Sequence, residues 1–248
     1  MECSHGYVRV DYDDEIATIV IDGERRTNAI DLPLAVDFRE AVRWVEQSDA
    51  RAAVVRGAGG TYCAGGDLTQ SPEQFIEAVD TSLDAIVQMY ESGTPYIAAI
   101  ERVAVGGGLE IAVACDLRVA DADATLKLPE ASLGIIPPAG AARLLVQHVG
   151  LSRARDLLLT GRSISGATAA DWGLITRTTD DPESVVETAQ SLARTIAEQP
   201  PAALSALNKA INAAFPQPIS SAKWDLELAK PLIQSEEFTD RKRGFLDQ

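Results

Sequence analysis

The stretches YCAGGDL at residues 62–68 and GGGLE at residues 106–110 decide how this chain folds. Each follows a short apolar run, AAVV at 52–55 and YIAAI at 96–100, and the second leads into the apolar helical stretch LEIAVA at 109–114. A strand that ends in a glycine turn and opens a helix leaves backbone N–H groups without partners inside the helix. Those donors, together with the positive end of the helix dipole, suit a developing negative charge. Two such ends that face each other would form a cradle for an oxyanion.

Either stretch alone has a simpler explanation. A triple glycine is more often a tight turn or a close contact between a helix and a sheet than a catalytic element. Neither stretch has the phosphate-binding pattern G-x-x-x-x-G-K-[ST] or G-x-G-x-x-G. The catalytic interpretation therefore depends on the pairing of the two stretches and on the acids that follow them.

Two glutamates follow the glycines of the second stretch: Glu110, in the first turn after them, and Glu130, directly after Pro129. The simple interpretation of both is a solvated acid at a helix N-terminus, where the dipole favours negative charge. However, Leu109 and Ile111 belong to a helix that is apolar on most sides, so the carboxylate of Glu110 is expected to be partly buried. The sharper interpretation is a carboxylate pair that moves protons beside the cradle.

Several short motifs in a fixed order carry a family resemblance. Besides the two glycine stretches, they are RRTNAI at 25–30, ACDLRVA at 114–120, LPE at 128–130, LGIIP at 133–137, LTG at 159–161 and DWGLI at 171–175. Over nearly its whole length the chain resembles the crotonase superfamily, the enoyl-CoA hydratase/isomerase family. The resemblance implies an α/β fold with a crotonase-like ββα spiral core at residues 1–195, which binds acyl-CoA. It also implies a C-terminal helical region at residues 196–248 that mediates trimerisation, in a homotrimer or a dimer of trimers.

The resemblance also implies roles for individual residues. Ala64 and Gly107 would supply the two backbone N–H groups of an oxyanion hole for the thioester carbonyl. Glu110 would be the base that activates water, and Glu130 the acid that delivers a proton. In the same way the resemblance places Ala29 and the basic pair Arg25 and Arg26 near the CoA.

Three further residues of the first glycine stretch are expected to contact the substrate or its CoA: Gly65, Asp67 and Leu68. Asp67 also has a structural interpretation, because an Asp straight after a glycine turn readily accepts hydrogen bonds from local backbone N–H groups. The CoA is part of the substrate, so no separate cofactor is expected.

The two acids favour an enoyl-CoA hydratase, a lyase that adds water across the 2,3 double bond of an enoyl thioester. The alternatives on the same scaffold are double-bond isomerisation, dehydration of a 3-hydroxyacyl-CoA and hydrolysis of an acyl-CoA. A non-catalytic binding or scaffolding protein is a third possibility. The stretch PAGAARL at 138–144 lacks the Thr and Gln of the family's G-x-G-G-T-Q-R-L, which borders the acyl pocket, so the acyl group remains open.

The charge balance restricts the partners of the chain. Thirty-seven acidic residues face 22 basic residues, giving a net charge of −15. This balance opposes binding to nucleic acid or to anionic membranes, since both require a positive patch. Most basic residues are Arg, which is expected either of a high-salt cytoplasm or of a GC-rich genome. Because CoA is anionic, basic side chains should gather at its site; the candidates are Arg25, Arg26, Arg102 and Lys127, with Arg241, Lys242 and Arg243 as a weaker group.

The length of 248 residues suits one large domain with a sizeable core. The apolar runs are too short to cross a membrane, and the start of the chain has no targeting character, so a cytoplasmic enzyme is expected. Cys3, Cys63 and Cys115 have no metal or redox spacing, and no metal site is expected. Cys63, beside the cradle, is interpreted as a small buried residue.

The remaining pattern predicts alternating strands and helices, followed by helices. Residues 8–10 and 16–21 flank the turn Asp13–Asp14 and predict a hairpin. Apolar residues at helical spacing from Leu34 to Val45 predict a helix, as does the stretch 72–92, which covers the acyl pocket in the family. Beyond Leu151 the pattern predicts only helices, at 152–160, 183–198, 202–214 and 219–235.

Overall fold

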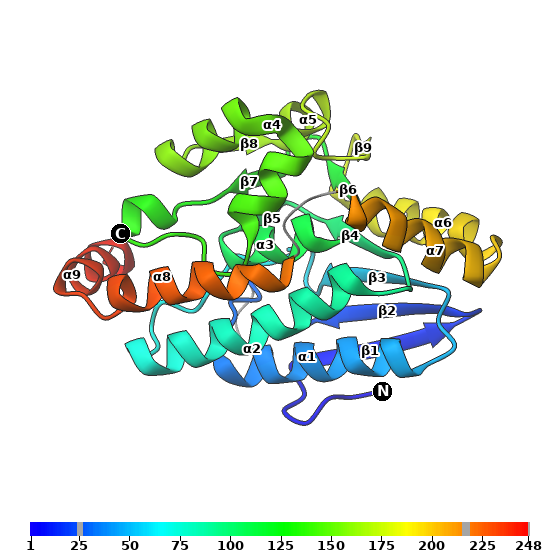
Figure 1. Ribbon diagram of the computed structural model, residues 1–248, viewed down its shortest axis with the longest axis horizontal. Helices are drawn as coiled ribbons and strands as arrows, with labels where there is room; N and C mark the ends of the chain where they lie inside the picture. The colour runs from blue at the N-terminus through cyan, green and yellow to red at the C-terminus, as the bar shows by residue number, and fades with distance from the viewer. Residues whose placement is uncertain (24–26, 215–218, 248) are drawn as a thin grey trace.

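The computed structural model describes residues 1–23, 27–214 and 219–247. Its strands are β1 (Val8–Asp13), β2 (Ile16–Ile21), β3 (Ala52–Gly57), β4 (Tyr96–Ile100), β5 (Val103–Val105), β6 (Leu117–Asp121), β7 (Thr125–Lys127), β8 (Ser163–Ser165) and β9 (Arg177–Thr179). They form a six-stranded sheet in the order β1-β2-β3-β4-β6-β9 and a three-stranded sheet in the order β5-β7-β8 (Figure 1). Strand β1 runs antiparallel to β2, and the other neighbours in the larger sheet are parallel.

Helices cover the sheets and form the C-terminal part of the chain. They are α1 (Leu32–Gln47), α2 (Pro72–Glu91), α3 (Gly107–Ala114), α4 (Ala141–Thr160), α5 (Gly166–Asp171), α6 (Val185–Ala197), α7 (Pro201–Ala213), α8 (Lys223–Ile233) and α9 (Glu236–Leu246). Short 3₁₀ helices are η1 (Glu130–Leu133), η2 (Pro182–Ser184) and η3 (Ile219–Ala222). Within the described ranges, no helix is long and apolar enough to cross a membrane.

The predicted N-terminal hairpin is confirmed, with its turn one residue later than expected. Strands β1 and β2 pair antiparallel from Val8–Ile21 to Asp13–Ile16. Asp14 and Glu15 form the turn in the left-handed region, at φ 47° and 61°, as a two-residue hairpin turn requires. Every residue of β2 is buried, whereas the second half of β1 is exposed. Strand β1 is therefore the edge of the sheet.

The helices predicted at 34–45 and 72–92 are α1 and α2, and each begins at a side-chain cap. The carboxylate of Asp31 accepts the backbone N–H of Leu34 at 2.9 Å. Ser71 and Gln74 form a reciprocal capping box at the start of α2. The apolar faces of α1 and α2 pack against each other and against the core that includes Phe38. Helix α2 is thereby fixed as one wall of the molecule.

A repeated strand–strand–helix unit brings the two glycine stretches together. The chain passes through a strand of the larger sheet, then a strand or bridge of the smaller sheet, and then a helix: β4, β5 and α3, followed by β6, β7 and η1. In the preceding unit, after β3, Cys63 replaces the second strand and pairs with Ala104. The N–H of Cys63 donates to Val103, and the N–H of Val105 donates to Cys63. The expected α/β spiral is confirmed.

The prediction of helices alone beyond Leu151 is wrong. Strands β8 and β9 and the short helix α5 lie between the predicted helices 152–160 and 183–198. Each strand has only three residues. Strand β8 pairs with β7 and strand β9 pairs with β6, and both partners lie far earlier in the chain. Such short strands show no alternation of apolar and polar residues, so long-range pairing decides their structure.

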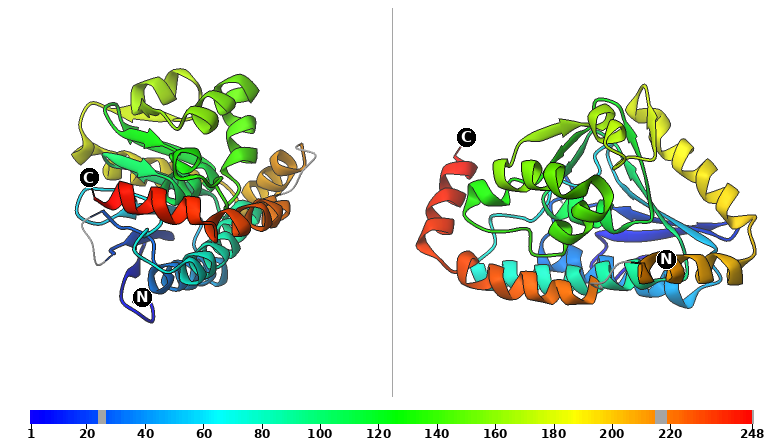
Figure 2. Two further views of the ribbon diagram at one scale, coloured as in Figure 1. Left: turned by 90° about the vertical axis from the view of Figure 1, so that its left-hand side faces the viewer. Right: turned by 45° about the horizontal axis from the view of Figure 1, so that its top comes forward.

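The C-terminal helices fold back onto the core. Figures 1 and 2 show α8 lying along α2, with α9 turning away at one end of the molecule. The rings of Phe75 in α2 and Phe238 in α9 lie 6.0 Å apart, centroid to centroid. The C-terminal region, α7 to α9, therefore contributes to the walls of the core through α8 and α9.

Candidate active site

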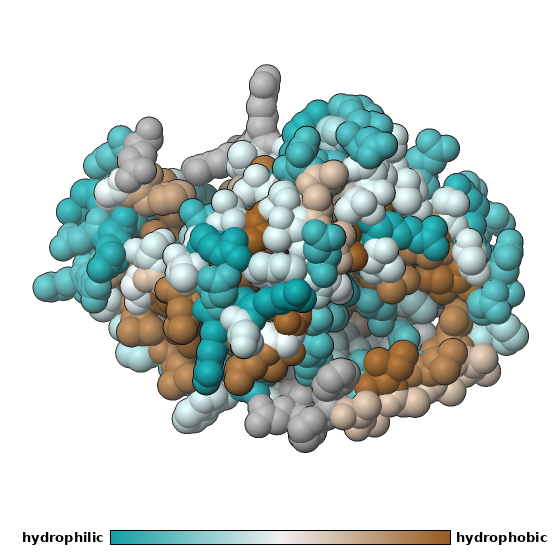
Figure 3. All heavy atoms as spheres, turned by 90° about the horizontal axis from the view of Figure 1, so that it is seen from above, coloured by the Kyte–Doolittle hydropathy of each residue, from teal (hydrophilic) through white to brown (hydrophobic). Residues whose placement is uncertain are grey.

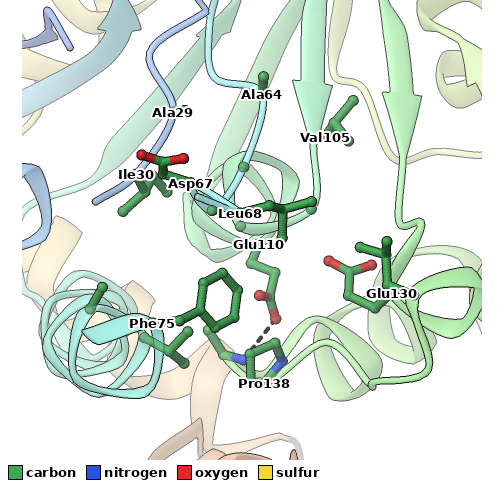
Figure 4. A pocket seen from close by; sticks show the side chains of 18 of the residues that line it. Ala29, Ile30, Ala64, Asp67, Leu68, Phe75, Val105, Glu110, Glu130 and Pro138 are labelled. Atoms are coloured by element: carbon green, nitrogen blue, oxygen red, sulfur yellow. Dashed lines mark hydrogen bonds between the residues drawn. The ribbon is translucent and has the colours of Figure 1, made fainter. Parts of the chain in front are cut away.

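A pocket of about 220 Å³ lies between α2, the start of α3, η1 and the end of α9 (Figure 4). Most of its wall is apolar, from side chains such as Ile30, Phe75, Val79 and Leu133. The acidic side chains at the wall are Glu110, Glu130 and Asp67. An apolar pocket with a few convergent polar groups is the usual form of a small-molecule site.

Two main-chain N–H groups bind the carboxylate of Glu110. It lies in the first turn of α3 and is 2% exposed. Its Oε1 accepts the N–H of Ala139 at 2.8 Å and the N–H of Ala141 at 3.3 Å. Burial raises the pKa of Glu110 to about 7; the two N–H bonds lower it, and the nearby Asp225 raises it. Glu110 is therefore a carboxylate with a fixed orientation and a pKa suited to a base near neutral pH.

Glu130 faces Glu110 across the pocket. It is the first residue of η1, is 5% exposed and has one oxygen, Oε2, that is fully buried without a hydrogen-bond partner among the described residues. Figure 4 shows its carboxyl group pointing toward that of Glu110. Burial, followed by repulsion from Glu110, raises the pKa of Glu130 to about 8. The two acids therefore differ in environment, and Glu130 keeps its proton to higher pH.

The first glycine stretch offers one backbone N–H to the pocket. The N–H of Ala64 donates to the Thr27 carbonyl at 2.9 Å, so Ala64 cannot be the oxyanion donor, and that prediction is corrected. The N–H of Gly65 donates to the Cys63 sulfur, and the N–H of Asp67 donates to Ile30. Among residues 64–67, only the N–H of Gly66 makes no hydrogen bond within the described part of the chain.

The second glycine stretch offers the N–H of Gly107, the first residue of α3. Its N–H is one of the groups that a helix N-terminus leaves without an intrahelical partner. A Cβ placed on Gly107 would lie 3.8 Å from the nitrogen of Gly66, and a Cβ placed on Gly65 would lie 3.3 Å from the nitrogen of Gly107. The two N–H groups are thus neighbours, and both residues line the pocket beside Glu110 and Glu130.

Substitution of Glu130 by Gln is expected to stabilise the protein at alkaline pH. The pKa of Glu130 is about 8 in the folded protein and about 4.5 in the unfolded chain. Between these pH values this carboxyl group ionises more readily in the unfolded chain, so the folded protein loses stability as the pH rises. Gln does not ionise. The melting temperature of Glu130→Gln should exceed that of the wild type most at pH 9 and least at pH 5. A variant that is no more stable at pH 9 would show that this acid is not buried as described.

A sequence model of the family described as enoyl-CoA hydratase/isomerase matches residues 11–247. The chain belongs to the enoyl-CoA hydratase/isomerase family.

Named relatives of this family cover most of the chain. A Bacillus subtilis (strain 168) protein named "Probable enoyl-CoA hydratase" is 36% identical over 78% of this chain and 76% of its own. The 1,2-epoxyphenylacetyl-CoA isomerase of Escherichia coli (strain K12) is 30% identical over 80% of this chain and 79% of its own. The crystal structure of enoyl-CoA hydratase from Bacillus anthracis superimposes with a TM-score of 0.80, at 29% identity, over 97% of this chain and 96% of that one. Membership of the family therefore does not decide between hydration and isomerisation.

The structure brings most of the predicted substrate-contact residues of the hydratase/isomerase family to the pocket. Ala29, Gly65, Asp67 and Leu68 all line it. Asp67 also makes the predicted local turn, in which its Oδ1 accepts the N–H and the hydroxyl of Thr69. The predicted pair Arg25 and Arg26 lies outside the described residues.

Two predicted CoA contacts do not reach the pocket of this family member. Arg102 lies in the turn between β4 and β5, where its guanidinium binds the Gly60 carbonyl and Glu183. Lys127 contributes its carbonyl oxygen, which accepts the N–H of Gly106, but its side chain is not part of the pocket wall. The ion pair with Glu183 of η2 holds the Arg102 side chain away from the pocket. The sequence around Arg102 does not indicate this partner.

Sequence reasoning missed the backbone N–H groups that bind Glu110 and the one that Gly66 offers to the pocket. Ala139 and Ala141 lie in the stretch that departs from the family pattern, but they act through N–H groups rather than through side chains. Gly66 lies in the first glycine stretch, where the motif alone assigns it no role. The signal for all three was present, because a buried acid requires hydrogen-bond donors and small residues leave the backbone accessible.

Cys63 is confirmed as a small buried residue. It is fully buried, and burial raises the pKa of its thiol to about 12. A thiol with such a pKa is not a nucleophile at neutral pH. A Cβ on Gly108 would lie 2.3 Å from the Cys63 carbonyl oxygen, so glycine at 108 permits the close approach of the two stretches.

Proposed function

We propose that this protein is an enoyl-CoA hydratase. The observation that carries the proposal is the pair of buried carboxyl groups, Glu110 and Glu130, that face each other in an apolar pocket beside two backbone donors. Neither acid is tied to a basic side chain in the described part of the chain. A working pair favours hydration over isomerisation, for which one acid is sufficient.

The reaction follows from the arrangement of these groups. The N–H groups of Gly66 and Gly107 hold the thioester oxygen and draw electrons from the double bond, so that the β-carbon becomes electrophilic. The free oxygen of Glu110 takes a proton from water while the water oxygen bonds to the β-carbon. Glu130 gives its proton to the α-carbon, and the enolate charge on the thioester oxygen returns to the carbonyl. One water is added, and a proton passes back from Glu110 to Glu130 through solvent before the next turnover.

The product of two isomeric thioesters tests the proposal. Purified protein is incubated with crotonyl-CoA and, separately, with 3-butenoyl-CoA. The products are separated by liquid chromatography against standards of both isomers, and mass spectrometry detects any added water. We expect a mass gain of one water from crotonyl-CoA and no conversion of 3-butenoyl-CoA at a comparable rate. Rapid conversion of 3-butenoyl-CoA to crotonyl-CoA without hydration would identify an isomerase instead.

The pH profile is expected to be bell-shaped. Hydration requires Glu110 ionised and Glu130 protonated, so kcat/KM should rise as the pH passes about 7 and fall as it passes about 8. The two limbs belong to the coupled pair rather than to either residue alone. Initial rates with crotonyl-CoA between pH 5 and 10 check this. A rate that keeps rising above pH 9 would contradict a protonated Glu130 in the working enzyme.

We infer that the CoA lies at the rim formed by Leu68 and the end of α9, where Phe245 and Leu246 are about half exposed. Helix α9 also places two cations beside this rim. Lys242 donates to the Gln70 carbonyl at 2.8 Å. Arg241, which also pairs with Glu237 at 2.9 Å, donates to the Ser132 carbonyl at 3.2 Å. In a chain with a net charge of −15, these cations support an anionic CoA at this rim.

We further propose that the protein forms a homotrimer or a dimer of trimers. None of the residues of α7 is buried, and Leu207 and Ile211 are each 57% exposed. Figure 3 shows apolar residues gathered along the edge of the molecule that α7 forms. An apolar helix face left open in one chain is typical of an interface between copies.

A further inference from the structure

A partly buried ion pair connects the first turn of α4 to helix α8. The guanidinium of Arg143 donates from Nε to Oδ2 of Asp225 at 3.2 Å and from Nη2 to Oδ1 at 3.1 Å. The two side chains are 18% and 11% exposed. A two-point contact of this kind fixes orientation as well as distance. Asp225 is therefore held firmly against the start of α4.

The same turn of α4 supplies the hydrogen bonds to Glu110. Helix α4 begins at Ala141, whose N–H donates to Glu110, and the N–H of Arg143 donates to the Gly140 carbonyl. Arg143 thus lies two residues from one of the donors that orient Glu110. Helix α8, which carries Asp225, packs on α2 (Figure 1), and α2 supplies Phe75 and Val79 to the pocket wall. The ion pair ties the turn 139–141 to this wall.

The pair also places balanced charge behind Glu110. The ionic groups that act on Glu110 are Glu130 of η1 and Asp225 of α8, and the charge of Asp225 is offset by Arg143. Two other titratable groups on the packed elements have partners of their own. Asp84 of α2 pairs with Lys223 at 3.3 Å, and His148 of α4 contacts the Val113 carbonyl, with burial lowering its pKa to about 4. Loss of either partner of the pair would leave one net charge near Glu110.

We propose that Arg143 and Asp225 are positioning residues for Glu110, which act through the main-chain turn 139–141 and make helix α8 part of the hydration machinery. This inference rests on the proposed function. Neither residue is part of the pocket wall; both act through the orientation and the charge state of the base.

The charge effects of the two single substitutions are opposite in sign. Arg143→Met leaves the Asp225 carboxylate unopposed, so the acidic limb of kcat/KM should move to higher pH by about one unit. Asp225→Asn removes the negative charge and keeps the positive charge of Arg143, so the limb should move to lower pH by about the same amount. In Arg143→Met/Asp225→Asn the limb should return to the wild-type position, while kcat stays about tenfold lower because the turn has lost its anchor.

Two further variants complete the comparison. Arg143→Lys keeps the charge but loses the two-point contact, so it should keep the wild-type limb with a reduced kcat; it also serves if Arg143→Met does not fold. Arg162→Met breaks the exposed pair with Asp156 at the other end of α4 and should change neither limb nor kcat. Limbs that stay in place or move in the same direction in both single variants would overturn the proposal, and so would a double variant with wild-type kcat.

A titration that needs no turnover separates this inference from the proposed function. The infrared carboxylate band of Glu110, assigned by its loss in Glu110→Gln, is followed against pH in the wild type and both single variants. Opposite shifts in a protein that does not hydrate crotonyl-CoA would support the charge effect and refute the hydratase function. Unshifted bands in a protein that does hydrate it would overturn the positioning role alone.

Discussion

Replacement of Glu110 by Gln is expected to lower kcat for the hydration of crotonyl-CoA by about a hundred- to ten-thousandfold. Gln keeps the size of the side chain, and its carbonyl oxygen can still accept the N–H groups of Ala139 and Ala141. The loss therefore reports the missing base rather than a collapsed pocket. Glu130→Gln should have an effect of the same order, because it removes the proton donor. Steady-state rates on crotonyl-CoA and melting curves of the same samples measure both.

Glu101 offers a matched control for these two substitutions. It is a third buried glutamate, 7% exposed, whose pKa is also raised by burial, but it lies outside the pocket wall and beside Arg56. Glu101→Gln should leave kcat within a fewfold of the wild type. A similar loss in all three variants would mean that the rate reports general stability, and that the two acids are not a catalytic pair.

Gly66→Ala is expected to lower kcat by about a hundredfold or more, because it displaces one donor of the oxyanion hole. A Cβ on Gly66 would lie 2.6 Å from Cε2 and 3.0 Å from Cζ of the Phe75 ring. That ring is 7% exposed and packs against Phe238, so we expect part of the strain to fall on the backbone that carries the N–H. Rates with crotonyl-CoA, measured at saturating substrate, give the change in kcat.

The Phe75 ring also provides the control for Gly66→Ala. Phe75→Leu removes the atoms that the new Cβ would meet, so Gly66→Ala/Phe75→Leu should recover most of the rate relative to Phe75→Leu alone. No recovery would indicate that the methyl group acts on the substrate directly. An unchanged kcat in Gly66→Ala itself would argue against Gly66 as a donor.

The sequence predicted the frame of the site better than its details. The two glycine turns, the two acids and helix α2 could be predicted because each depends on local pattern or on a motif. The choice of Gly66 over Ala64 could not, because it depends on which N–H a distant carbonyl, that of Thr27, already accepts.

Other details depend on contacts between elements that are distant in sequence. Strands β8 and β9 form only because β7 and β6 are already in place. The ion pair between Arg143 and Asp225 joins residues 82 positions apart. Short-range pattern carries no information about such contacts, and the packing of the spiral determines them.

The two buried acids also lower the stability of the folded protein when they ionise. Both pKa values are raised because burial disfavours the charged forms, so the ionised pocket is less stable than a neutral one. A gain in stability on Glu130→Gln, with a loss of rate, would be a case of the common opposition between stability and activity.

The absorbance of the conjugated thioester during the reaction with crotonyl-CoA is the most direct test of the hydratase assignment. Wild type, Glu110→Gln, Glu130→Gln and Glu101→Gln are compared at low salt and in molar KCl, since the net charge of −15 could require salt for folding. We predict loss of the band with wild type and Glu101→Gln, and almost none with the two pocket variants. A folded wild-type protein that binds crotonyl-CoA but leaves the band unchanged at both salt concentrations would contradict the assignment.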